Sequence, residues 1–373
     1  MGWNIPDIPQ KKILSYPNYK YWVFFLILLL SITTLVTLFS FDISLGKVFL
    51  FIILPIFAVW LCVLGFLLNK YERSVMISNS WDSEINNVKE LWRSWSKKQL
   101  AIVGNVILTP EKEGMKVLLE ELKDIPAYPK KARPLFDYSL DVTHVLKAID
   151  NGLEKQCSGY RHYLYHIYVL QTNNSLKLRA EKAIFAQWDL VPIFIDSLDE
   201  IENLYDEESS ENFVLLMTLQ NWSGRSDNKF SELVSAQLIA SQHFINRKSI
   251  YPMAALGRIM PICLSEINDD LDMLFEFNQL DKKQLQYVWL TGNIHDIAIK
   301  IMQYAAEKQW LLPNKLPLRS LDYSFGPASK MSFPLSLAML VEAVSKTGKN
   351  QLVFSLSGGN DGYLCLVTRG FLE

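Results

Sequence analysis

The residue types that most often carry enzyme chemistry are scattered through this chain of 373 residues, and their spacing matches no familiar catalytic pattern. The five histidines form no H-E-x-x-H zinc motif, and the chain has neither a G-x-S-x-G nucleophile turn nor a Walker-type phosphate loop. Its widely separated cysteines argue against a disulfide framework and a zinc site, and they fit a reducing compartment. They are Cys62, Cys157, Cys263 and Cys365. These patterns assign no catalytic residue, no metal ligand and no cofactor.

Four local arrangements suggest chemistry, but a structural interpretation is preferred for each. His162 and His166 lie around the strand-like run YLYHIYVL, where a four-residue spacing does not pair two metal ligands as it would on a helix. Cys157 lies near His162 and suggests a Cys/His pair, but a structural cysteine at a helix end is the preferred interpretation. Residues 223–226 (SGRS) are expected to form an exposed loop. Residues 358–362 (GGNDG) lack the Lys-Ser/Thr and the following helix of a phosphate loop.

The elements that must position any functional residue begin with a hydrophobic hairpin. Tyr21–Phe41 and Val48–Leu68 contain no charged residue, and each is long enough to cross a hydrocarbon core of about 30 Å as a helix. The link Asp42–Lys47 is too short for anything but a turn. With no ionisable residue in either span, the hairpin indicates a membrane anchor rather than a transport pathway. The alternative is a signal peptide followed by a buried helix, but the first span exceeds a signal-peptide core and no cleavage site follows it.

Basic residues near the span ends set the expected orientation. The turn carries Lys47 alone, beside Asp42, whereas both flanks of the hairpin are basic. We therefore expect a multi-pass protein of the bacterial inner (plasma) membrane with both termini in the cytoplasm. The flanking basic residues are Lys11, Lys12, Lys20, Lys70 and Arg73.

The expected organisation is a cytoplasmic tail (1–20), a transmembrane helical hairpin (21–68), a helical neck (69–99) and a cytoplasmic α/β domain (100–373). The neck carries an apolar stripe that could pack on the following domain or face the membrane interface. Its members are Trp81, Ile85, Val88, Trp92 and Trp95. The net charge of −2 and the lack of a basic stripe argue against nucleic-acid binding.

Beyond residue 100, apolar runs with strand spacing alternate with helical patterns, which predicts a layered α/β domain. Ser197–Asp206 opens with a capping box, Ser-Leu-Asp-Glu. Strands are expected over 100–108, 163–170, 192–196, 213–219, 231–243, 286–291, 352–357 and 363–368, the last two as a hairpin. Helices are expected over 110–122, 142–155, 176–188, 295–308 and 335–345.

The last ninety residues resemble the C-terminal half of the thiolase-like (ketoacyl synthase) fold, with landmarks in the same order. Residues 288–293 (VWLTGN), then Asp296 and a helix, are similar to the family's H-G-T-G-T stretch. Residues 320–329 (SLDYSFGPAS) are similar to its S-x-K-x-x-x-G-H stretch, and 357–362 (SGGNDG) to its G-G-T-N hairpin. Residues 230–239 (FSELVSAQLI) resemble its G-E-G-A-A-A-L-V-L segment. The resemblance implies a thiolase-like α/β domain.

The chain departs from that family at the positions of its catalytic residues. Trp289 or Leu290 stands where the first family histidine is expected, and Pro327 stands where the second is expected. The strand-to-helix elbow that would hold the nucleophilic cysteine corresponds to Ile195–Asp199, which contains no cysteine. Acyl transfer requires a nucleophile and donors to the oxyanion. We therefore expect a catalytically degenerate thiolase-like domain, a pseudoenzyme rather than an enzyme.

The anchor, the Trp-rich neck and the connector PAYPKKARPLF also resemble inner-membrane accessory proteins of type VI secretion systems, including adaptors of lipase effectors. This resemblance implies a non-catalytic, membrane-anchored binding or adaptor protein. Its partners would be the lipid bilayer and a protein, such as a secreted effector or secretion machinery. Two alternatives remain open: an acyl-group enzyme of thiolase-like fold acting at the membrane, and a structural membrane component.

Overall fold

The computed structural model describes most of the chain. The described residues are 2–40, 49–112, 114–119, 131–136, 141–171, 177–207, 210–220, 229–283, 285, 287–292, 294–314, 316–326, 329–356 and 359–372. Contacts divide the chain into two compact units. One comprises Ile5–Leu91, and the other combines Met1–Asn4 with Trp92–Glu373.

Among the described residues, two helices are long and apolar enough to cross a membrane, as the hydrophobic hairpin predicts. They are α1 (Tyr19–Ser40) and α3 (Leu54–Ser96), and a π-helical turn, η1 (Phe49–Ile53), precedes α3. Pro55 has no N–H to donate, and this explains why the regular helical ladder begins only at the end of η1. The turn between the two spans lies outside the described residues.

The helix α3 contains 43 residues, so at 1.5 Å per residue it is about 65 Å long, roughly twice the thickness of a hydrocarbon core. The segment expected to form a helical neck is therefore continuous with the second apolar helix. Two residues of its apolar stripe pack in the larger unit, where the rings of Trp92 and Trp95 meet edge to face at 5.3 Å.

Among the described residues of the larger unit, eleven strands form one mixed sheet in the order β3-β2-β4-β5-β1-β6-β11-β10-β8-β9, and β7 pairs with β11. The strands are β1 (Gln99–Leu108), β2 (Leu164–Gln171), β3 (Ile193–Ile195), β4 (Phe213–Gln220), β5 (Leu233–Ala240), β6 (Ala254–Gly257), β7 (Met260–Cys263), β8 (Tyr287–Gly292), β9 (Arg319–Ser320), β10 (Gln351–Leu356) and β11 (Asp361–Thr368). The antiparallel pairing of β1 with β6 joins the two halves of the sheet.

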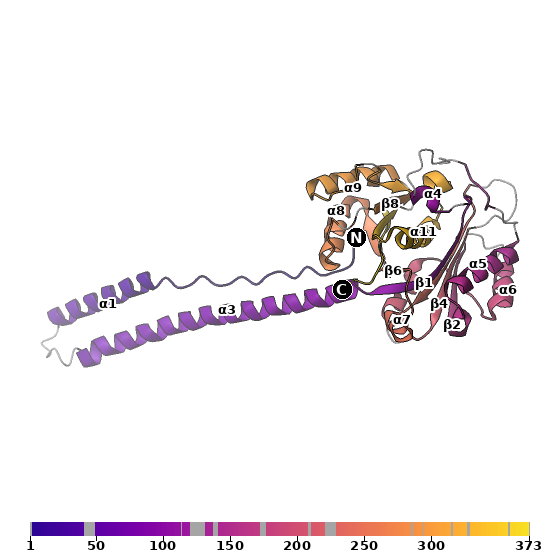
Figure 1. Cartoon of the computed structure of the whole chain (residues 1–373). Helices are drawn as coiled ribbons and strands as arrows, with labels where there is room; N and C mark the ends of the chain where they lie inside the picture. The colour runs from indigo at the N-terminus through magenta and orange to yellow at the C-terminus, as the bar shows by residue number, and fades with distance from the viewer. Residues whose placement is uncertain are drawn as a thin grey trace. The chain divides into compact units, whose positions relative to one another are not determined.

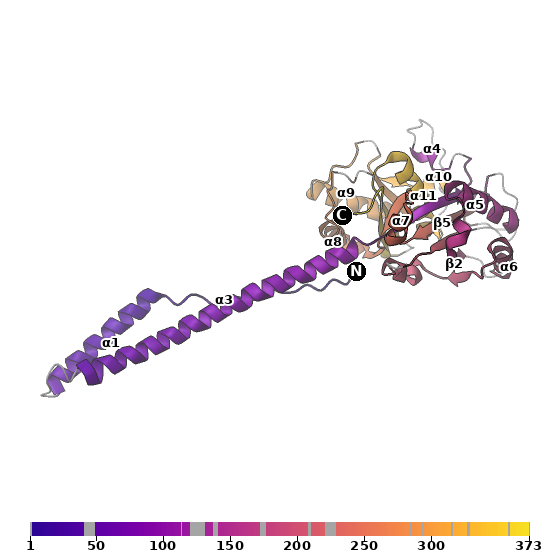
Figure 2. The same ribbon diagram turned by 60° about the horizontal axis from the view of Figure 1, so that its bottom comes forward.

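Helices cover both outer faces of this sheet. They are α4 (Lys116–Leu119), α5 (Val142–Gln156), η2 (Tyr160–Tyr163), α6 (Lys177–Trp188), η4 (Leu198–Tyr205), α7 (Gln242–Lys248), η5 (Leu264–Glu266), α8 (Ile267–Phe277), α9 (Ile294–Glu307), α10 (Asp322–Phe325) and α11 (Ser332–Thr347). Figures 1 and 2 both show α8 and α9 on one side of the unit and α5 and α6 on the other. The arrangement is the layered α/β domain that the sequence predicts.

The core between the two halves is built around α11. Strand alternation places Leu100 and Ile102 of β1 in the cluster that surrounds α11, whereas Ala101 and Val103 face the helices α5, α6 and α7. The cluster around α11 also contains Val353 of β10, so both halves of the sheet pack against the same central helix. A helix that is apolar on nearly every side is expected in such a position.

Most sequence-based element predictions agree with the structure, including the hairpin, in which β10 and β11 are antiparallel neighbours. The strand expected over 231–243 is wrong at its end. Ser241 leaves the strand and caps α7, because its Oγ accepts a hydrogen bond from the amide of Phe244 at 3.1 Å. The strands β6 and β7 and the helix α8 were not predicted.

Candidate functional site

A cleft of about 610 Å³ lies where the ends of several strands meet the start of α11. One wall comes from β2, β3 and the start of η4, and the opposite wall comes from α11, β8, β10 and β11. A cavity of this volume can hold a small-molecule ligand or an acyl chain. The lining residues are Leu170, Asp196, Ser197, Leu198, Phe230, Gly292, Ser329, Lys330, Met331, Ser332, Phe333, Pro334, Leu356 and Tyr363.

The strand-to-helix elbow after β3 presents Ser197 to this cleft. Ser197 has extended backbone angles (φ −142°, ψ 165°) and precedes the first turn of η4. The Glu200 carboxylate accepts hydrogen bonds from the amides of Asp196 (2.8 Å) and Ser197 (3.4 Å), which confirms the predicted capping box. The Glu200 side chain therefore fixes the backbone of the elbow.

Two hydroxyl groups from distant parts of the chain donate to one carboxylate at the cleft. The Ser197 hydroxyl donates to Asp199 Oδ2 at 3.1 Å, and the Tyr363 hydroxyl donates to the same oxygen at 3.4 Å. The Tyr363 ring stacks on Phe333 at 5.2 Å. Burial, together with the nearby Asp199 carboxylate, raises the pKa of Tyr363, so the phenol keeps its proton.

The other serines of the cleft are engaged in local structure. The Ser329 hydroxyl hydrogen-bonds to the Gln220 side chain and accepts from the amide of Met331 at 3.0 Å. The Ser332 hydroxyl donates to the Ser329 carbonyl at 2.7 Å. Ser197 is therefore the cleft serine whose hydroxyl faces a carboxylate.

A buried carboxyl group supports the end of β8 beside the cleft. Asp322 Oδ2 accepts from the amide of Gly292 at 2.7 Å, and the Thr291 hydroxyl lies 3.0 Å from Oδ1. Burial raises the pKa of Asp322 to about 6, against the lowering effect of these two hydrogen bonds. Gly292 itself lines the cleft, so Asp322 fixes one part of the cleft wall.

The position aligned with the first family histidine does not line the cleft. Trp289 and Leu290 are buried, and the Trp289 indole donates to Gln351 Oε1 at 2.7 Å. The cleft is reached instead by Gly292, at the end of the same strand. Pro327 and the loop 223–226 lie outside the described residues.

The cysteines of the larger unit lie in structural environments. Burial raises the pKa of the Cys365 thiol, which donates to the Gly257 carbonyl at 3.3 Å. Burial and then Glu154 raise the pKa of Cys157, which ends α5. Cys263 Sγ lies 3.1 Å from Ser265 Oγ. Neither a cysteine nor a histidine is among the described residues that line the cleft, and its serine hydroxyls are those of Ser197, Ser329 and Ser332.

The histidine pair of the sequence is also separated by local structure. His162 belongs to the short helix η2, whereas His166 lies on β2 with its ring 4.3 Å from that of Tyr165. In the part of the chain that the structure describes, no group of three or more His, Cys, Asp or Glu side chains is placed to hold a metal ion.

Sequence reasoning located the elbow but missed its polar partners. Tyr363 is 164 residues from Asp199 and reaches it only through the fold. Asp322 belongs to the stretch 320–329 that resembles the ketoacyl synthase family, but the neighbouring sequence does not show that its carboxyl group is buried. The adjacency of Ser197 and Asp199 was the one signal in the sequence, because an N-cap serine followed by an acid two residues later can hydrogen-bond locally.

Ketosynthases share this fold at low sequence identity. A β-ketoacyl synthase from Burkholderia phymatum matches with a TM-score of 0.52 and 10% identity over 73% of this chain and 100% of that chain. A ketosynthase domain of oxazolomycin synthesis from Streptomyces albus matches with a TM-score of 0.54 and 10% identity over 74% and 98%. A type II polyketide ketosynthase in complex with its acyl-carrier protein matches with a TM-score of 0.54 and 8% identity over 73% of this chain and 99% of that chain. No family model and no curated protein matches the chain.

These matches confirm the thiolase-like α/β fold. They also correct one expectation: the prediction that the chain is not an enzyme is contradicted at the level of the fold, because the solved structures named above are ketosynthases. The resemblance to accessory proteins of type VI secretion is not tested by these structures and stays a prediction from the sequence.

Proposed function

We propose that this chain is a membrane-anchored enzyme of thiolase-like fold that transfers acyl groups, with Ser197 as the residue that accepts the acyl group. The observation that carries the proposal is that Ser197, on the β3–η4 elbow, lines a cleft of about 610 Å³ and that its hydroxyl donates to Asp199 at 3.1 Å. A nucleophile next to a group that can take its proton is the minimum arrangement for covalent acyl transfer.

The first half-reaction forms a serine ester and releases a thiol. Ser197 Oγ attacks the carbonyl carbon of an acyl thioester while its proton passes to the Asp199 carboxylate. The C–S bond then breaks, and the departing thiolate takes that proton. In the second half-reaction a nucleophile on the acceptor replaces Ser197 at the same carbonyl carbon and returns a proton to Ser197.

The helix η4 begins at the cleft, which supports stabilisation of the negative charge on the attacked oxygen. The first amides of a helix lack intrahelical partners, and the helix N-terminus carries partial positive charge. Donors that are fixed before the reaction stabilise an oxyanion without reorganisation.

The shape and character of the cleft support an acyl substrate. Its walls include apolar side chains on both sides, and exposed Lys330 stands at α11. The apolar residues are Leu170, Leu198, Phe230, Met331, Phe333 and Leu356. One structure with the same fold is a ketosynthase in complex with an acyl-carrier protein, so we propose a carrier-bound acyl thioester as the donor and that carrier as the protein partner.

The test is acylation of the purified full chain in detergent by an acyl thioester of pantetheine, with acyl chains of several lengths, followed by intact-mass measurement. We expect one acyl adduct on the wild type and none on Ser197→Ala, with the adduct site identified by peptide mapping. Ser197→Cys should restore acylation, because a thiolate is the stronger nucleophile.

The matched control is Ser158→Ala, which removes an exposed hydroxyl that donates to Glu154 outside the cleft. This control should be acylated like the wild type. Absence of an adduct at every chain length, or an adduct that persists in a folded Ser197→Ala variant, would overturn the proposal.

A further inference from the structure

A second pocket lies in the smaller unit, Ile5–Leu91, at the end of the apolar part of α3. It encloses about 390 Å³ between α3 and the extended segment that precedes α1. Four of its nine lining side chains are cationic, and none is acidic. The lining residues are Lys11, Lys12, Leu14, Phe66, Asn69, Lys70, Arg73, Ser74 and Ile77.

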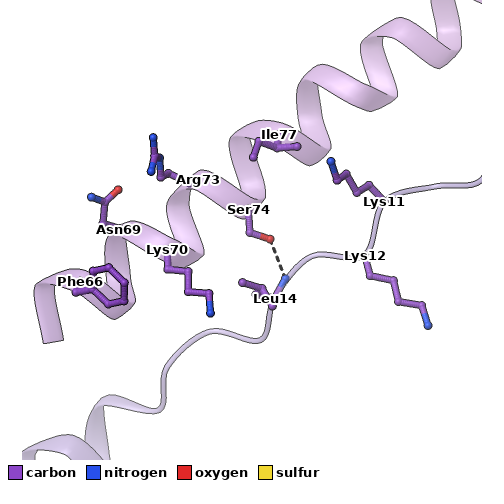
Figure 3. Close-up of a pocket in the computed structure, with 9 residues that line it drawn as sticks. All are labelled: Lys11, Lys12, Leu14, Phe66, Asn69, Lys70, Arg73, Ser74 and Ile77. Atoms are coloured by element: carbon purple, nitrogen blue, oxygen red, sulfur yellow. Dashed lines mark hydrogen bonds between the residues drawn. The ribbon is translucent and has the colours of Figure 1, made fainter. Parts of the chain in front are cut away.

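Hydrogen bonds hold the N-terminal wall of this pocket against α3. The amide of Leu14 donates to Ser74 Oγ at 2.9 Å, and the Ser78 hydroxyl donates to the carbonyl of Lys11 at 3.3 Å. The dashed line in Figure 3 marks the first of these bonds. The pocket is therefore formed by two segments, α3 and the N-terminal segment, that are hydrogen-bonded to each other.

Aromatic contacts on both sides of the pocket reinforce this arrangement. Towards the domain, the Trp81 indole donates to the Pro9 carbonyl at 3.0 Å. Towards the membrane, the rings of Tyr16 and Tyr71 meet edge to face at 5.0 Å. Tyrosine and tryptophan are enriched at membrane–water interfaces, so this pair marks the boundary of the apolar span.

The positive charge of the pocket is not neutralised within the protein. In the described part of this unit, none of its four cationic side chains forms an ion pair with a carboxylate. Figure 3 shows Lys70 projecting from α3 towards the N-terminal segment and Lys11 projecting from that segment towards Ile77. Figure 3 shows the side chains of the other two cationic residues, Lys12 and Arg73, pointing away from the space between the two segments. Lysine offers mobile ammonium donors and arginine a planar fork, and both recognise phosphate oxygens.

The apolar side chains that line the pocket are also unusually exposed to solvent. Phe66 is 68% exposed, Leu14 is 46% exposed and Ile77 is 49% exposed. Phe66 belongs to the apolar span, and Lys70 follows it one helical turn later, where a span meets its interface. A ligand that combines an anionic group with hydrocarbon matches both features at once.

We propose that this pocket binds the phosphate-bearing head group of an anionic phospholipid, with Lys70 on the phosphate, Lys11 adding positive charge from the N-terminal segment, and Phe66 against the acyl chains. The proposal is independent of the acyl chemistry assigned to the cleft. Clusters of Lys and Arg beside a transmembrane helix attract anionic lipids, and here the tied N-terminal segment turns such a cluster into a pocket.

The experiment is native mass spectrometry of the full chain in detergent micelles with added phosphatidylglycerol or phosphatidylcholine of the same acyl chains. We expect preferential retention of phosphatidylglycerol. In the Lys11→Gln/Lys70→Gln variant its retention should fall about 10- to 30-fold, because each removed charge weakens the attraction of an anionic head group several-fold. Phosphatidylcholine retention should not change.

A control variant, Lys147→Gln/Lys155→Gln, removes the same charge from the exposed face of α5 and should bind like the wild type. Lys11→Arg/Lys70→Arg should keep the lipid preference. If the Gln variant fails to fold, the wild type itself must lose its preference at high salt, since screening weakens exposed charge pairs.

A further arm separates a lipid from a free anion. Millimolar inorganic phosphate should not displace phosphatidylglycerol if Phe66 and the acyl chains contribute, and Phe66→Ala should weaken retention. Displacement by inorganic phosphate with no effect of Phe66→Ala would assign the site to a soluble anion. Equal retention of the two lipids by the wild type would show that the cationic side chains set only the orientation of the hairpin in the membrane. This result, or displacement by inorganic phosphate with no effect of Phe66→Ala, would overturn the proposal.

Discussion

The buried carboxyl group of Asp322 gives this fold a pH dependence of unusual sign. Its pKa in the folded protein is about 6, compared with 3.8 for an unperturbed aspartate, so the folded state holds the proton more tightly than the unfolded chain. The stabilisation from this group is complete below about pH 4, is lost as the pH rises to 6, and does not change further above that. The shift corresponds to roughly 3 kcal/mol.

Asp322→Asn should remove this dependence. An asparagine keeps an acceptor for the Gly292 amide and a donor for the Thr291 hydroxyl, but it carries no charge at neutral pH. We expect the variant and the wild type to have similar thermal unfolding midpoints at pH 4 and the variant to be the more stable at pH 7. Asp296→Asn, at an exposed site on α9, is the control. A difference between variant and wild type that does not change with pH would contradict the prediction.

The proposed acyl transfer makes a separate prediction about Asp199. Asp199→Asn keeps a side chain of the same shape but removes the carboxylate that the Ser197 hydroxyl faces at 3.1 Å. We expect the rate of Ser197 acylation to fall about 100-fold or more, the usual contribution of a positioned general base. Tyr363→Phe should change the rate much less, since its hydroxyl contacts Asp199 at 3.4 Å. The measurement is the initial rate of adduct formation, and similar rates for the two variants would remove Asp199 from the mechanism.

At the scale of elements, Arg258 joins three parts of the larger unit. Its side chain is 1% exposed and lies between the rings of Trp95 (4.3 Å) and Tyr205 (5.0 Å). Its Nε donates to the Trp95 carbonyl at 3.0 Å, and its guanidinium pairs with Asp206 at 2.5 Å. The last turn of α3, the end of η4 and the turn after β6 therefore meet at one cation.

Arg258→Met should destabilise the larger unit by roughly 2–4 kcal/mol, because it removes a desolvated cation–π stack, the hydrogen bond to the Trp95 carbonyl and the ion pair with Asp206. Arg179→Met removes an exposed ion pair with Asp141 and should cost less than about 1 kcal/mol. Unfolding midpoints of the two variants in the same detergent provide the comparison. Equal midpoints would show that the Arg258 contacts add nothing beyond surface pairing.

The elements that the sequence predicted well are those with strong local signals. Val142–Gln156 has a regular apolar stripe and an N-cap at Asp141, whose carboxylate accepts from the amide of Thr143 at 3.3 Å. The strand predicted over 231–243 is too long because no polar residues separate the end of β5, which is buried on both faces, from Ser241, the N-cap of α7. The strands β6 and β7 contain four residues each, too few for alternation to be read.

At the scale of the whole molecule, long-range pairing supplied what local patterns could not. The two halves of the sheet join where β1 pairs with β6, with Gln99 opposite Gly257, more than 150 residues later in the chain. The candidate site depends on the same closure, since Tyr363 reaches Asp199 across the cleft only after both halves have folded. The sequence located the elbow, but it could not show which polar groups the fold would bring to it.

The orientation of the hairpin follows from charges at the ends of its two apolar helices. Basic residues near the span ends are retained in the cytoplasm, and here they flank the hairpin on both sides, whereas the link Asp42–Lys47 carries one lysine beside an aspartate. We expect a fluorescent-protein fusion after Glu373 to be bright and an alkaline phosphatase fusion there to be inactive, as for a cytoplasmic C-terminus.

The same charge rule predicts how the orientation can be changed. Ser44→Lys and Leu45→Lys in the link, combined with Lys70→Gln and Arg73→Gln, reduce the charge asymmetry from which we expect both ends to lie in the cytoplasm, so a fraction of the C-terminal phosphatase fusions should become active. Lys147→Gln with Lys155→Gln, far from the spans in sequence, should leave the orientation unchanged. An active phosphatase on the unaltered chain would place the cleft and its proposed acyl chemistry on the opposite side of the membrane from the cytoplasm.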